Sequence, residues 1–191
     1  MDAIEHENPS PSPRSALRTQ LQSARRAWLA SAEGAGAHAA LSQRLAEVLR
    51  QLEPVCLGLY WPLAGEFDAP AYWTAHALPG VSLALPHAEP GGAMRYRLWD
   101  GAVPTAKDGM DIPTAQGAWA DPDVVLVPCL GVTRDGCRLG YGGGYFDRWL
   151  AAHPGATAVG LAWSVGECDF EVQAHDVPLT VVVTEREVWA P

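Results

Sequence analysis

The sequence has few cysteines, and its histidines are scattered. The four cysteines form no CxxC pair and do not match the spacing of a zinc finger. None of the six histidines stands four residues from another, so no two of them share one face of a helix at that spacing. This pattern favours reduced thiols in a cytoplasmic protein over a zinc site.

Long apolar runs and an excess of positive charge are also missing. The longest apolar run is far too short to cross a bilayer, and the polar residues 1–12 lack the apolar core of a signal peptide. We therefore expect a cytoplasmic protein with no membrane partner. The chain has 13 basic and 22 acidic residues, a net charge of −9, which argues against nucleic acid as the main partner. A small anionic ligand remains compatible with this charge, because one basic pocket can lie within a negative field.

Hydrophobic residues make up 48% of the 191 positions, which is enough for one domain with a substantial core. We expect residues 1–12 to be disordered and residues 13–191 to form that domain. After the first helix, apolar strand patterns alternate with helical ones. The predicted strands are 55–60, 81–85, 94–99, 124–127, 157–163 and 180–184, and the predicted helices are 36–52, 68–77 and 143–152. Segment 100–121 is rich in proline, glycine and aspartate and is expected to be a long loop.

This alternation predicts an α/β fold with a mainly parallel sheet and helices on both faces, in three layers. In such folds ligands bind beyond the carboxyl ends of the strands. The first helix begins at Ser12 and Pro13, a capping hydroxyl followed by proline. Arg14, Arg18 and Arg25 lie beside its apolar stripe, where a ligand or solvent could reach them.

The segment RLGYGGGYFDR at 138–148 carries the clearest chemical signal. It places four glycines within five positions, after the apolar run 124–128. Glycine tolerates positive φ and has no Cβ, so the backbone N–H groups of such a turn can approach an anion. The segment matches neither the GxxxxGK[ST] loop nor the GxGxxG dinucleotide motif. A purely structural turn before a helix is the alternative reading.

Three further features are ambiguous by themselves. Glu66 follows a predicted strand, and its carboxylate could accept hydrogen bonds from the N–H groups of a heterocycle beside Trp61. Alternatively, Glu66 or Asp68 could cap a helix. Asp147 and Asp176 offer two carboxylates for a hard cation such as Mg²⁺, although ordinary turn chemistry also explains Asp176.

Arg14 and Arg18 stand four residues apart and could clamp a triphosphate. An exposed helix face is the usual explanation for such a pair.

Together these features resemble the 5-formyltetrahydrofolate cyclo-ligase family, also called methenyltetrahydrofolate synthetases. The strongest likeness is VPCLGVTRDGCRLGYGGGYFDR at 127–148, and supporting matches lie at 14–18, 65–68 and 176–184. The resemblance covers about residues 13–189. It implies ATP-dependent closure of 5-formyltetrahydrofolate to 5,10-methenyltetrahydrofolate, with Mg²⁺, through a phosphorylated formyl group and with release of ADP and phosphate. The alternatives are a related ATP-dependent enzyme acting on another formamide or pterin, and a non-catalytic nucleotide-binding protein.

The resemblance also implies roles for individual residues in a monomer that binds ATP and 5-formyltetrahydrofolate. Arg138 and Tyr145 would be catalytic, and Asp147 and Asp176 would hold Mg²⁺. ATP would be bound by Arg14, Arg18, Arg138, Leu139, Gly140, Tyr141, Gly142, Gly143, Gly144, Tyr145 and Phe146. The folate would be bound by Trp61, Glu66, Tyr141, Gly142, Gly143, Gly144 and Tyr145. Arg14, Gly143 and Phe146 depart from the lysine or tyrosine found there in other members.

Overall fold

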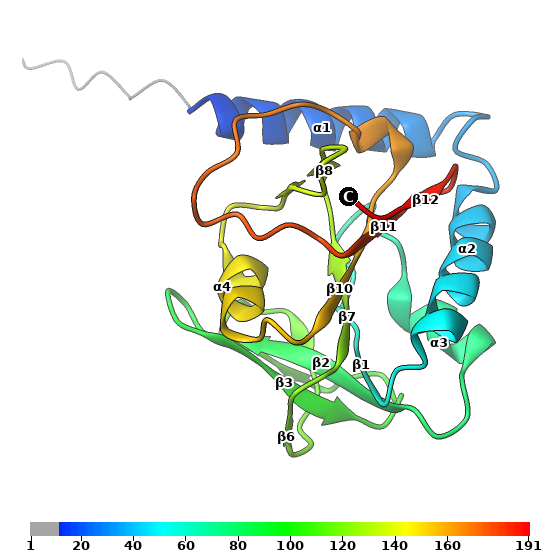
Figure 1. Cartoon of the computed structure of the whole chain (residues 1–191), viewed down its shortest axis with the longest axis vertical. Helices are drawn as coiled ribbons and strands as arrows, with labels where there is room; N and C mark the ends of the chain where they lie inside the picture. The colour runs from blue at the N-terminus through cyan, green and yellow to red at the C-terminus, as the bar shows by residue number, and fades with distance from the viewer. Residues whose placement is uncertain (1–11) are drawn as a thin grey trace, which may run out of the picture.

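A computed structural model describes residues 12–191, and its centre is one eight-stranded sheet (Figure 1). The strand order is β12-β11-β10-β7-β1-β2-β3-β6. The bounds are β1 Cys56–Gly58, β2 Ser82–Ala88, β3 Met94–Trp99, β6 Trp119–Ala120, β7 Val124–Pro128, β10 Thr157–Leu161, β11 Val181–Val183 and β12 Val188–Trp189.

The five neighbouring strands from β11 to β2 run parallel. Strands β3, β6 and β12 are antiparallel and lie at the two sides of this parallel centre. The predicted α/β fold with a mainly parallel sheet is therefore confirmed. The central strands are apolar on both faces because both faces are covered.

Helices cover the two faces of the sheet and give the predicted three layers (Figure 1). Residues of α2 (Ala37–Leu52) and α3 (Ala69–His76) share a core with Val124 and Leu126 of β7. The alternate residues of β7, Val125 and Val127, face the other way and pack with Trp149 of α4 (Tyr145–Ala152). Successive strand residues point to opposite faces, so one strand serves both cores.

The first helix, α1 (Pro13–Leu29), crosses the end of the molecule near the β8 hairpin (Figure 1). Its N-cap Ser12 accepts a hydrogen bond from the Ser15 N–H at 3.3 Å, so residue 12 belongs to the ordered start of the helix. The predicted disorder of residues 1–11 lies outside the described residues. No helix within residues 12–191 is long and apolar enough to cross a membrane.

Two small antiparallel strand pairs lie in segments where the sequence predicts no strand. Strands β4 (Ala106–Lys107) and β5 (Pro113–Thr114) pair within the predicted loop 100–121, which also contains β6. Strands β8 (Gly131–Val132) and β9 (Arg138–Leu139) form a hairpin between β7 and the glycine-rich segment. The glycines therefore follow a short hairpin strand and not the central strand itself.

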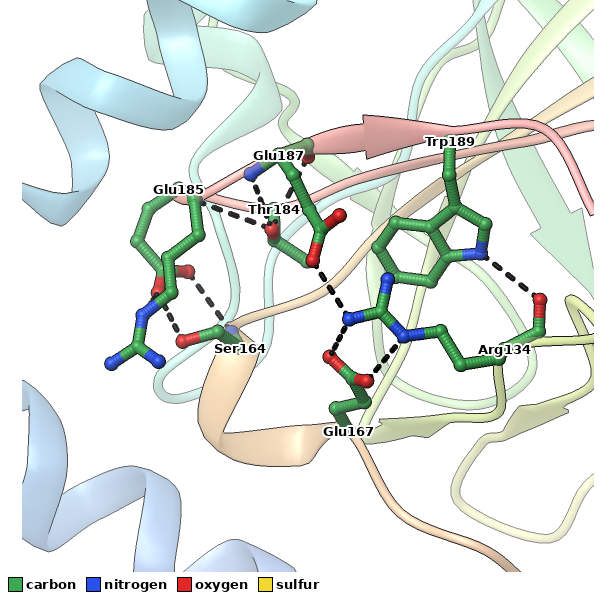
Figure 2. Close-up of polar contacts among 8 residues, drawn as sticks. Arg134, Ser164, Glu167, Thr184, Glu185, Glu187 and Trp189 are labelled. Atoms are coloured by element: carbon green, nitrogen blue, oxygen red, sulfur yellow. Dashed lines mark hydrogen bonds and ion pairs between the residues drawn. The ribbon is translucent and has the colours of Figure 1, made fainter.

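An ion-pair network holds this hairpin to the last strand (Figure 2). Arg134, in the β8–β9 turn, pairs with Glu167, which follows the short 3-10 helix η1 (Ser164–Gly166). The same guanidinium pairs with Glu187 at 2.8 Å, and the indole N–H of Trp189 donates to the Arg134 carbonyl at 3.1 Å. The network thus joins three segments that are far apart in the sequence.

Candidate active site

A cavity of about 620 Å³ lies where strands β1, β2 and β7 end. This position at the carboxyl ends of parallel strands is the one that the fold predicts for a ligand. Of the predicted site residues, the cavity is lined by Arg14, Arg18, Trp61, Glu66, Arg138, Gly140, Tyr141, Gly142, Gly143, Gly144, Tyr145, Phe146, Asp147 and Asp176. Leu139 is the exception: its side chain is fully buried in a small core with Leu21 and Leu130, away from the cavity.

The glycine loop connects β9 to α4. Gly142 and Gly144 have positive φ values of 98° and 63°, conformations that favour glycine. The carbonyl of Gly140 accepts from Arg18 Nε at 2.8 Å, and that of Gly143 accepts from Arg148 Nη1 at 2.9 Å. Within the described chain, the N–H groups of Gly142, Gly143 and Gly144 donate to no protein acceptor. The loop therefore has backbone donors free for an anion.

Three arginines converge on the cavity. Arg14 binds both carboxylate oxygens of Asp176, at 2.8 and 3.2 Å, and Arg138 binds Asp147 at 2.7 Å. Burial lowers the pKa of Arg18, and the neighbouring charge of Arg14 lowers it further. Two cations held this close to one another favour an anionic ligand between or beside them.

The buried Nε atoms of Arg14 and Arg138 have no hydrogen-bond partner among the described residues. Unpaired guanidinium donors of this kind are costly unless a ligand accepts from them.

Glu66 supplies a buried acceptor on another wall of the cavity. Its Oε2 accepts from the Leu63 N–H at 2.7 Å, while its buried Oε1 has no partner in the described part of the chain. Burial raises the pKa of Glu66, and the bond from Leu63, the charge of Arg25 and the nearby Tyr141 hydroxyl partly offset that effect. Asp68, the alternative reading, caps α3 by accepting from the Ala71 N–H at 2.9 Å. Asp68 thus performs the capping, and Glu66 stays available for a donor.

Aromatic side chains complete this end of the site. Trp61 is half-buried and packs edge-on against Trp99, with ring centroids 6.4 Å apart. The hydroxyl of Tyr145 donates to the Glu89 carbonyl at 3.0 Å and lies 3.1 Å from the Met110 sulfur. Met110 belongs to the segment that was expected to be a loop, so this segment forms a wall of the cavity.

Arg25 was expected to be accessible, and the structure shows that it is buried. Its Nη2 donates to the Ala64 carbonyl at 3.0 Å and also to the Tyr141 hydroxyl. Arg25 therefore joins the turn before Glu66 to the glycine loop. The sequence held no signal for this contact, because Arg25 and Tyr141 are 116 residues apart.

Asp147 and Asp176 both line the cavity and lie close together in the fold. Asp147 Oδ1 accepts a long bond of 3.4 Å from the N–H of Val177, the residue next to Asp176. Burial by itself raises the pKa of Asp176, but the hydrogen bonds from Arg14 and Gln173 outweigh it and lower the pKa. No group of three or more His, Cys, Asp or Glu suited to a metal exists within residues 12–191. The carboxylates of Asp147 and Asp176 are instead paired with Arg138 and Arg14.

Comparison with known families gives one clear match. Residues 11–185 match the model of the 5-formyltetrahydrofolate cyclo-ligase family. A 5-formyltetrahydrofolate cyclo-ligase of Mycolicibacterium smegmatis is 41% identical over 69 residues, 35% of this chain and 35% of that protein. One from Escherichia coli K12 is 37% identical over 70 residues, 35% of this chain and 38% of that protein. The aligned part thus spans little more than a third of these two relatives.

Solved structures match over nearly the whole chain. A 5,10-methenyltetrahydrofolate synthetase from Mycoplasma pneumoniae superimposes with a TM-score of 0.74 and 21% identity, covering 91% of this chain and 99% of that one. The Aquifex aeolicus 5,10-methenyltetrahydrofolate synthetase gives a TM-score of 0.71 and 25% identity, covering 93% and 92%. At this level of identity, the first match establishes a shared fold.

Proposed function

Since this chain belongs to the 5-formyltetrahydrofolate cyclo-ligase family, we propose that it converts 5-formyltetrahydrofolate to 5,10-methenyltetrahydrofolate with ATP. One observation carries the proposal. A single cavity combines free backbone donors and arginines on one side with the unpartnered buried acceptor of Glu66 on another. This is the pairing that a polyphosphate and an N–H-bearing heterocycle require.

The proposed binding roles follow from these contacts. The phosphates of ATP contact Arg14, Arg18, Arg138 and the N–H groups of the glycine loop. Leu139 supports the loop from the core. Phe146 lies beside the Arg138 guanidinium, whose Cζ is 5.4 Å from the centroid of the Phe146 ring. Glu66 accepts from the pterin next to Trp61.

The reaction requires the formyl oxygen to become a leaving group. The formyl oxygen attacks the γ-phosphorus, and the bond from that phosphorus to the bridging oxygen breaks as ADP leaves. The neighbouring folate nitrogen then attacks the formyl carbon and gives up its proton, and the C–O bond breaks with release of phosphate. Arg138 would stabilise the transferred phosphoryl group, and Tyr145 would border the formyl group. No nucleophilic side chain is needed.

We further propose that Asp147 and Asp176 hold Mg²⁺ together with phosphate oxygens. The ion would neutralise phosphate charge when it is bound. Both carboxylates are held in place by arginines, so the protein fixes their positions before a ligand arrives. We also expect the enzyme to act as a cytoplasmic monomer, without nucleic-acid or membrane partners.

The test is the appearance of methenyl-folate absorbance when purified protein is given ATP, Mg²⁺ and 5-formyltetrahydrofolate. We expect turnover that needs all three. Folded protein that turns over another formamide or pterin but not this folate would support the related-enzyme alternative. Calorimetry that shows ATP binding without turnover of any substrate would support a non-catalytic nucleotide-binding protein.

A further inference from the structure

A second cavity, of about 360 Å³, lies beside the first. Leu63 and Tyr141 line both cavities, so the two are contiguous at these side chains. The second cavity is lined by Gln22, Arg25, Arg26, Leu29, Leu63, Ala64, Gly65 and Tyr141. None of the predicted phosphate-binding side chains except Tyr141 belongs to it.

Helix α1 forms a wall of both cavities. Arg14 and Arg18 line the larger one, and Gln22, Arg25 and Arg26 line the smaller one. Spacings of three and four residues place such side chains along one side of a helix. At 1.5 Å of rise per residue, Arg18 and Arg25 are roughly 10 Å apart along the axis. The helix thus presents two separate cationic groups.

The second cavity has the character of an anion site. No Asp or Glu is among its lining residues, although the whole chain has a net charge of −9. Arg25 is only 5% exposed, and its buried Nη1 has no hydrogen-bond partner among the described residues. A buried guanidinium donor without an acceptor is unfavourable, and a bound carboxylate would satisfy it. Arg26, an exposed cation, stands at the same cavity.

We propose that the second cavity binds the glutamate carboxylates of the folate substrate. The two substrates have two strongly anionic parts, the phosphates of ATP and the glutamate tail of the folate. The larger cavity contains the residues proposed to bind the phosphates. The smaller cavity is then the site for the glutamate tail. The turn from Leu63 to Gly65 lines the second cavity, and the next residue, Glu66, lines the first. A folate with its pterin at Glu66 would therefore pass its tail beside Leu63 and Tyr141. This inference rests on the proposed function.

The test places a negative charge in the second cavity by the substitution Gln22→Glu. Gln22 is half-buried and makes no side-chain hydrogen bond in the described part of the chain, so the fold should tolerate the change. The matched control is Ser23→Glu, which puts the same charge on an exposed, neighbouring position outside both cavities. Three substrates are compared: 5-formyltetrahydropteroate, which lacks glutamate, and the mono- and triglutamate forms of 5-formyltetrahydrofolate.

We expect Gln22→Glu to raise the KM of the glutamate-bearing substrates roughly fivefold or more through charge repulsion. The KM of the pteroate, the KM of ATP and kcat should stay unchanged, and Ser23→Glu should resemble the wild type. Equal effects on all three substrates, or equal effects of the two substitutions, would overturn the proposal.

A binding measurement separates failure of this site from failure of the proposed function. Calorimetry with p-aminobenzoyl-triglutamate needs no turnover. We expect binding that Gln22→Glu weakens and Ser23→Glu does not. Absence of binding to the wild-type protein overturns the tail site, whereas absence of turnover alongside selective binding overturns only the proposed reaction.

Discussion

Arg138 is a buried cation whose partner, Asp147, is also nearly buried; their side chains are 5% and 12% exposed. Arginine offers a planar set of donors, and Arg138 uses one of them on Asp147 while its Nε stays free. A lysine at position 138 could keep the ion pair with Asp147. Its single ammonium group could not also hold a second donor in a fixed direction toward a phosphate. The geometry of the guanidinium, and not only its charge, therefore matters at this position.

We expect Arg138→Lys to lower kcat roughly tenfold or more, which corresponds to about 1.4 kcal/mol of transition-state stabilisation. The melting temperature should change little, because the charge next to Asp147 is kept. Arg138→Ala should also unfold more easily, by about 3–5 kcal/mol, since it leaves a buried charge unpaired. Steady-state kinetics and thermal unfolding check both variants, with Arg50→Lys on the exposed end of α2 as the control. A fully active Arg138→Lys enzyme would remove Arg138 from the proposed reaction.

Glu66 should make stability depend on pH. Its pKa is raised in the folded protein because burial disfavours the charged carboxylate. The folded state therefore binds the proton more readily than the unfolded state. Glu66 therefore stabilises the folded state most below the pKa that it has in the unfolded chain. This stabilisation is lost as the pH rises through the folded-state pKa.

Glu66→Gln removes this dependence and keeps an oxygen acceptor for the Leu63 N–H. We expect the variant to melt higher than the wild type at neutral pH, by roughly 2–4 °C for each kcal/mol gained. The difference should shrink below pH 4.5, and the KM for folate should rise. Thermal unfolding at several pH values measures this, with Glu47→Gln on the exposed face of α2 as the control. A difference that grows on acidification would contradict the assignment.

The conformation of the glycine loop, residues 140–144, determines where the Arg18 side chain lies. A Cβ at Gly142 would approach Arg18 Cζ to 3.3 Å, and the positive φ there strains any other residue by roughly 1–2 kcal/mol. We expect Gly142→Ala to raise the KM for ATP severalfold, since Arg18 must move from the Gly140 carbonyl.

Gly155→Ala is the matched control, because a Cβ there meets no atom within 4 Å and the residue lies in a turn away from the site. Both variants are compared by ATP titration of turnover. An unchanged KM for ATP in Gly142→Ala would show that the loop conformation is not needed for nucleotide binding.

The longer elements could be predicted from the sequence because their patterns are strong. The apolar run of β7 and the capped start of α1 each have a local physical cause, and both are present in the structure. The two-residue strands β8 and β9 were missed because so short a segment has no periodicity. Leu139 was placed with its glycine neighbours, but strand alternation turns its side chain into the core. Arg25 was misjudged because only the folded chain brings Tyr141 to it.

At the scale of the whole molecule, the site joins parts of the chain that are otherwise distant. The larger cavity draws on α1, on the turn after β1 and on the segments around the glycine loop and Asp176. A ligand that binds there should therefore stabilise the domain as a unit. The principle is mass action, since the unfolded chain has no such cavity.

We expect a non-hydrolysable ATP analogue and 5-formyltetrahydrofolate each to raise the melting temperature, with a larger rise when both are present. At 100 times the dissociation constant, one ligand adds about 2.7 kcal/mol, which is roughly 5–10 °C for a domain of this size. Differential scanning fluorimetry measures the shifts. Ligand-free buffer of equal ionic strength serves as the control. Absence of any shift with either ligand would argue against the shared cavity.

Helix α1 is held with little buried surface: of its 17 residues, Leu21, Arg25 and Trp28 are the buried ones. Leu17 and Leu29 add partly buried apolar contacts. Arg14, Arg18 and Arg25 add polar contacts to residues around the two cavities. An enzyme without substrates should thus release this helix before the rest of the domain opens. Limited proteolysis would measure this opening: cleavage within α1 should slow when ATP occupies the larger cavity and contacts Arg14 and Arg18.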